Sequence, residues 1–91
     1  MKKLFLNSES YWRPDFDSIL ITKEGSIAFL NQKSAFIFFN LIIRKTTDAD
    51  FYLDKNVSQE ELDDFISFMI KSGFATTQSV ETENISPLYH Y

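Results

Sequence analysis

Short apolar stretches separated by turn residues dominate the first third of the chain and predict β-strands. A first strand is expected over Ser8–Arg13 and is stopped by Arg13-Pro14-Asp15, because proline cannot donate a hydrogen bond to a sheet ladder. Asp17–Thr22 and Ser26–Leu30 are predicted to pair as a hairpin. Their three-residue turn, Lys23-Glu24-Gly25, ends in a glycine that can take a positive φ.

The pattern then changes to helical spacing. Asn31 is expected to cap a helix over Gln32–Arg44, because its side-chain oxygen can accept a free backbone N–H. Apolar residues surround almost the whole of this helix and leave only a narrow polar strip around Lys33, Asn40 and Arg44. Such a helix must be buried on most sides.

A short helix is predicted next, capped within Thr46-Thr47-Asp48 and ending near Leu53. It would contribute Phe51 and Leu53 to the core. After it, the segment 58–74 carries the clearest local signal of the chain. Ser58-Gln59-Glu60-Glu61 is a capping box, in which the Ser58 hydroxyl and the Glu61 carboxylate accept each other's backbone N–H.

Both ends of this long helix are therefore marked in the sequence. Val57 and Leu62 occupy the two positions of a hydrophobic staple. Gly73 lies where a left-handed residue ends a helix, and Phe74 is spaced to contact Met69 in a Schellman closure. The side chains expected to form the core stripe are Leu62, Phe65, Ile66 and Met69.

The order of these elements predicts one α+β domain over residues 1–75, in which a three-stranded antiparallel sheet packs on a three-helix, winged-helix-like bundle. Thr76–Asn84 is polar and acidic, and Ile85–Tyr91 is aromatic and without periodicity. Residues 76–91 are therefore predicted to form a tail that is either mobile or docked on another surface.

Composition narrows the possible functions. The 91 residues contain no cysteine and a single histidine, His90. We therefore expect no thiol or imidazole chemistry in the domain, no metal, no cofactor and no enzymatic activity. The aspartates at 48, 50 and 54 do not make a calcium loop, because Leu53 and Gln59 stand where glycine and glutamate are required. Leu4-Phe5-Leu6 is too short for a signal peptide and Ala35–Phe39 for a membrane span, so a cytoplasmic protein is expected.

Charge is unevenly distributed. Residues 1–45 hold seven basic and four acidic side chains, a net charge of +3, whereas residues 46–91 hold two basic and nine acidic, a net charge of −7. A winged-helix protein that binds DNA, or an antirepressor, would carry basic residues on its reading helix. Helix 59–72 instead carries four acids and Lys71, so this alternative is disfavoured.

Several of these features coincide in one known family. The chain resembles the PqqD-like family of RiPP recognition elements, which bind the leader segment of ribosomally made peptide precursors. The resemblance covers roughly residues 8–75 and rests on these residues: Arg13, Ile19-Leu20-Ile21, Gly25, Ile27, Phe29, Leu30-Asn31, Ala35, Thr46-Thr47 and Ile70-Lys71-Ser72-Gly73-Phe74.

The resemblance implies a non-catalytic role. A precursor leader would add as a strand beside Ser26–Leu30 and be presented to a modifying enzyme or leader peptidase, with neither nucleic acid nor membrane as partner. Phe68 lies off the core stripe beside carboxylates, which suits a groove for an apolar anchor with a basic neighbour. The expected peptide-binding residues are Ser26, Ile27, Ala28, Phe29, Leu30, Glu61, Asp64, Phe65 and Phe68.

Simpler explanations exist for each of these features. Phe68 could pack under the C-terminal tail, and the acids of residues 60–64 could merely stabilise the positive end of their helix. The strand edge could be covered by the tail, through Tyr89 and Tyr91, or by a second copy of the chain, which would make a homodimer. A third hypothesis is an accessory subunit that dimerises and stabilises a larger enzyme.

Overall fold

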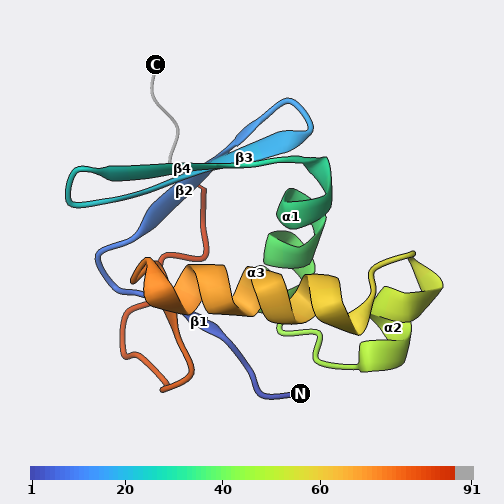
Figure 1. Ribbon diagram of the computed structural model, residues 1–91. Coiled ribbons are helices and arrows are strands. Elements are labelled where there is room, and N and C mark those ends of the chain that lie inside the picture. The colour runs from blue at the N-terminus through green and yellow to red at the C-terminus, as the bar shows by residue number, and fades with distance from the viewer. Residues whose placement is uncertain (88–91) are drawn as a thin grey trace.

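The computed structural model describes residues 1–87 and confirms the α+β class, with a three-stranded antiparallel sheet and helices beneath it (Figure 1). The sheet has the order β2-β3-β4, and a separate two-stranded sheet pairs β1 with β5. The strands are β1 (Phe5–Leu6), β2 (Tyr11–Asp15), β3 (Ser18–Lys23), β4 (Ser26–Leu30) and β5 (Ala75–Thr76). The helices are α1 (Gln32–Ile37), the π-helix η1 (Phe38–Ile43), α2 (Ala49–Asp54) and α3 (Gln59–Lys71).

The prediction for the first strand was wrong in its bounds, because β2 continues through Pro14 to Asp15. β2 is an outer strand. Asp15 and Ser18 pair directly across a two-residue turn, so the next pair, Pro14 with Ile19, is one whose backbone groups point away from each other. A proline nitrogen that faces away from β3 removes no bond of the ladder.

Both hairpin turns contain two residues, which corrects the predicted three-residue turn and shifts β3 to Ser18–Lys23. Lys23 pairs with Ser26, and the turn residues Glu24 and Gly25 both have positive φ, 40° and 85°. This is the backbone of a type I′ turn, whose twist matches that of the strands it joins. The predicted bounds of β4 agree with the structure.

The predicted helix over 32–44 begins as expected, because the Asn31 side chain accepts the Ser34 backbone N–H at 2.9 Å. After Ile37, however, the α-helix gives way to η1, and the Arg44 N–H bonds to the Phe39 carbonyl five residues back. Asn40 was expected on a polar strip but is only 6% exposed. Its side-chain amide donates to the Phe36 carbonyl at 2.9 Å, and a side chain that takes this carbonyl competes with the α-helical ladder.

In α2 the structure corrects which residue enters the core. Leu53 is 64% exposed, and Tyr52 is fully buried in its place. The Tyr52 hydroxyl donates to the Thr46 carbonyl at 2.5 Å, and burial raises the pKa of Tyr52 to about 12. Within the predicted cap, Asp48 is the residue that accepts a helix N–H.

The predicted capping box and the glycine at the end of α3 agree with the structure. Ser58 and Glu61 form the capping box, with both hydrogen bonds at 3.1 Å. Gly73 has φ 80° and its N–H bonds to the Ile70 carbonyl, as in a left-handed helix end. The inner face of the sheet packs on this helix and on α1 and η1. The buried residues at this contact include Trp12, Ile19, Ile21, Leu30, Ile37, Phe38, Leu41, Leu62, Phe65 and Met69.

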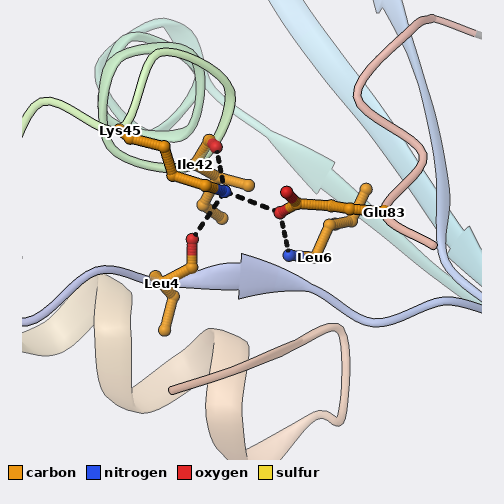
Figure 2. A network of polar contacts seen from close by, with 5 residues as sticks. All are labelled: Leu4, Leu6, Ile42, Lys45 and Glu83. Carbon is orange, nitrogen blue, oxygen red and sulfur yellow. Dashed lines mark hydrogen bonds and ion pairs between the residues drawn. The ribbon is translucent and has the colours of Figure 1, made fainter. Parts of the chain in front are cut away.

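The tail is attached through Lys45, which no pattern in the sequence indicates (Figure 2). The Lys45 ammonium donates to the Leu4 and Ile42 carbonyls at 3.0 and 2.6 Å and pairs with the Glu83 carboxylate at 2.7 Å. The same carboxylate accepts the Leu6 N–H at 2.6 Å. These five residues, here called the tail clamp, hold together three segments that are distant in the sequence. The described part of the tail is therefore docked, and Tyr89 and Tyr91 lie outside the described residues.

Within residues 1–87, none of the helices combines the length and the apolar character required to cross a membrane.

Candidate functional site

A groove of about 400 Å³ lies between β4 and α3. In Figure 1 these elements extend in similar directions, with the helix below the strand. This volume falls within the range of ligand pockets. The residues that line this β4–α3 groove are Phe29, Leu30, Asn31, Lys33, Ser34, Ile37, Glu61, Asp64, Phe65 and Phe68.

The open edge of β4 borders the groove. β4 pairs with β3 on one side, and no described residue forms a strand on its other side. Lys23 and Ser26 flank the type I′ turn and are therefore hydrogen bonded to each other. Because antiparallel pairs alternate, the backbone N–H and C=O groups of Ile27 and Phe29 point away from β3. These groups are available to another strand.

The five predicted positions on β4 have different surroundings. Phe29 and Leu30 line the groove, Phe29 being 61% exposed and Leu30 buried. Ser26, Ile27 and Ala28 do not line it. Ile27 lies with Phe29 on the outer face of the sheet, whereas Ala28 packs against the core. Ser26 and Ile27 can thus contribute to binding only through the strand edge or the outer face.

All four residues predicted on α3 line the groove. Glu61, Asp64, Phe65 and Phe68 follow one another at spacings of three, one and three residues, which keeps them on one side of the helix. Phe65 is buried at the base, whereas Phe68 is 44% exposed and its ring centroid lies 6.3 Å from that of Phe74. None of residues 76–87 lines the groove, so the described tail does not cover Phe68 here.

One charge of the groove is neutralised by its neighbour. The Lys33 ammonium lies 2.7 Å from the Glu61 carboxylate, which also accepts the Ser58 backbone N–H of the capping box. The Lys33 contact, and after it the Ser58 N–H, lower the pKa of Glu61. The Glu61 carboxylate is therefore ionised and already paired with Lys33, whereas Asp64 has no ion pair within the part of the chain that the structure describes.

α1 and its N-cap also contribute to the groove, which the sequence did not indicate. Asn31, Lys33, Ser34 and Ile37 all line it. The available signal was their position: α1 begins directly after β4, so residues at its start must lie beside the end of that strand. The sequence pattern places Lys33 only on the polar strip of its helix.

A second pocket, of about 560 Å³, opens beside the turn between β2 and β3. It is lined mainly by apolar residues, among them Phe36, Phe39, Ile85 and the fully exposed Phe16 of the turn. Unlike the β4–α3 groove, it has no basic residue among the described residues that line it. The β4–α3 groove is the stronger candidate because, within residues 1–87, it combines apolar side chains, three charges and a strand edge that no other strand covers.

Comparison with protein-family models, with curated proteins and with solved structures finds no match for this chain. A proposal about its function therefore rests on the geometry of the groove and on the sequence resemblance.

Proposed function

We propose that the protein is a non-catalytic module that binds an extended peptide by adding it as a fourth strand beside β4. The single observation that carries the proposal is the outward-facing edge of β4 beside the β4–α3 groove. In such β-augmentation, backbone hydrogen bonds supply affinity and side-chain pockets supply selectivity.

The groove supplies the features that such a peptide needs. Phe68 exposes apolar surface to it and Phe29 borders it at the strand edge, while Leu30, Ile37 and Phe65 form a buried base. Covering this surface stabilises a complex by roughly 25 cal/mol for each Å² of apolar surface removed from water. The peptide strand would also satisfy the backbone groups of Ile27 and Phe29.

The class of peptide follows from the resemblance to RiPP recognition elements. We infer a leader segment of a ribosomally made precursor, which the protein would hold for a separate modifying enzyme or leader peptidase in the cytoplasm. The acidic lining of the groove, with Glu61 and Asp64 against Lys33, is poorly suited to nucleic acid phosphates.

Titration of fluorescently labelled leader peptides from precursors encoded beside its gene tests the proposal. Phe68→Ala should weaken binding about tenfold, and Phe29→Asp should weaken it further by placing an unpaired charge at the groove. Ile70→Ala is the matched control, because Ile70 lies on the same helix and is 42% exposed but does not line the groove. Circular dichroism should stay close to that of the unmodified protein for all three variants.

Absence of saturable binding up to high micromolar concentrations would reject these leaders as ligands. Equal losses for Ile70→Ala and Phe68→Ala would show that the groove is not the binding surface. A second copy of the chain is the competing occupant of β4, and sedimentation velocity distinguishes it: self-association without peptide that Phe29→Asp abolishes would favour a dimer.

A further inference from the structure

We infer, resting on the proposed function, that the β4–α3 groove selects peptides with an apolar and a basic residue two positions apart. Phe65 and Phe68 contact the apolar side chain, and Asp64 pairs with the basic one. The inference follows from the balance of charge in the groove, from its exposed apolar surface and from the spacing of these residues along α3.

The uncompensated charge of the groove lies on one residue, Asp64. Of the described residues that line it, three are charged, and two of them, Lys33 and Glu61, form an ion pair at 2.7 Å. Glu61 is held further by the capping box. Asp64 is exposed and forms no ion pair among residues 1–87. A basic side chain in the groove therefore meets an unpaired carboxylate, whereas an acidic one is repelled.

The apolar contact lies one helical turn further along α3. Phe68 is half exposed and lies three residues after the buried Phe65. Asp64 and Phe68 are four residues apart in the helix, which separates them by about 6 Å along its axis. Both belong to the side of α3 that lines the groove.

An extended peptide matches this separation. Alternate residues of a strand point to the same side and are about 6.6 Å apart. Because α3 extends in a similar direction to β4 (Figure 1), a strand beside β4 would place side chains two residues apart over Phe68 and Asp64. The direction in which the peptide pairs with β4 decides which of the two residues comes first.

Selection of random dodecapeptides displayed on phage, against the immobilised full chain, tests this inference. The unmodified protein should enrich peptides with an apolar and a basic residue two positions apart. Selection against the Asp64→Lys variant should enrich peptides in which an acidic residue stands in place of the basic one. Asp63→Lys is the matched control, since Asp63 undergoes the same change of charge on the same helix outside the groove, and the original pattern should persist.

A selected peptide then gives the size of the effect. Replacing its basic residue by glutamine should lower the affinity of the unmodified protein about two- to fivefold, the range of an exposed ion pair. The same replacement should leave the affinity of Asp64→Asn unchanged. These titrations separate pairing at Asp64 from the general attraction of basic peptides to an acidic protein.

Enriched peptides that share an apolar residue without a basic partner, or an equal switch in Asp63→Lys and Asp64→Lys, would overturn the inference and leave peptide binding intact. Failure to enrich any peptide, or enrichment of peptides whose affinity is unchanged by Ile27→Pro, would overturn the proposed function together with the inference.

Discussion

The two outer strands of the same sheet differ in how they meet their surroundings. β2 carries Pro14, and the Asn84 side chain of the tail donates to the Ser8 and Ser10 carbonyls just before it, at 2.9 and 3.0 Å. β4 contains no proline, and no residue of 76–87 lines the groove beside it. Natural proteins protect exposed edges against pairing with other chains. One edge of this sheet has such protection, whereas no strand of residues 1–87 pairs with the other, which borders a groove.

A similar contrast separates the ion pairs of the two regions. The Lys45–Glu83 pair of the tail clamp is largely buried, and both of its side chains also form hydrogen bonds with backbone groups (Figure 2). The Lys33–Glu61 pair of the groove is exposed, with 51% and 37% of the two side chains accessible. The first pair holds distant segments together, while the second mainly sets the charge available to a ligand. The two regions should therefore respond differently to substitution.

The largest effect on stability is expected at the tail clamp. Glu83→Ala leaves the partly buried Lys45 ammonium without its carboxylate and the Leu6 N–H without its acceptor. We expect it to lower the free energy of unfolding by about 2–3 kcal/mol, measured by urea denaturation. Glu81→Ala removes the same charge from an exposed position of the same tail and should have little effect. Equal stabilities of the two variants would contradict the structural role of the clamp.

The next effect concerns the open edge itself. Ile27→Pro removes a backbone N–H that points away from β3. Pro14 of β2 lacks such an N–H in the same way, so the fold should stay intact. Peptide affinity should fall at least about tenfold, because one hydrogen bond is lost and the proline ring obstructs the edge. Ile27→Thr is the control that keeps the N–H while removing the apolar side chain. Calorimetric titration in which both variants lose affinity equally would point to the side chain and not to the strand edge.

The smallest effect is expected at the ion pair of the groove. Lys33→Gln should raise the pKa of Glu61 toward its ordinary value of 4.5, because the Lys33 contact is the main cause of its depression. A carboxyl group whose pKa is lower in the folded than in the unfolded protein stabilises the fold at pH values above the unfolded-state pKa. This stabilisation is lost as the pH falls through the folded-state pKa. NMR titration of the Glu61 carboxyl carbon measures the shift. The same midpoint in both proteins would show that Lys33 does not engage Glu61 in solution.

Local features of the fold were predictable from the sequence, whereas long-range ones were not. Asn31, the capping box of Ser58 and Glu61, and Gly73 act within one helical turn, so neighbouring residues suffice to place them. The π-helix depends on burial of Asn40, and the exchange of Leu53 for Tyr52 depends on how α2 meets the core. The pairing of Lys45 with Glu83 joins residues 38 positions apart. No periodicity reports such contacts.

In the candidate site too, local spacing was predictable from the sequence and tertiary contacts were not. Helical spacing was sufficient to place Glu61, Asp64, Phe65 and Phe68 on one side of α3, and the structure brings them to the groove beside Phe29. Their use in peptide binding remains a prediction. The sequence could not show that Lys33 neutralises Glu61, because that contact depends on how α1 packs beside α3.

The most direct test of the central claim is amide hydrogen exchange, measured residue by residue by NMR with and without a bound leader peptide. Exchange should slow at Ile27 and Phe29, whose N–H groups face the open edge of β4, and stay unchanged along β2. A saturating peptide that leaves Ile27 and Phe29 exchanging at their free rates, or that protects residues around the second pocket instead, would contradict strand addition at β4.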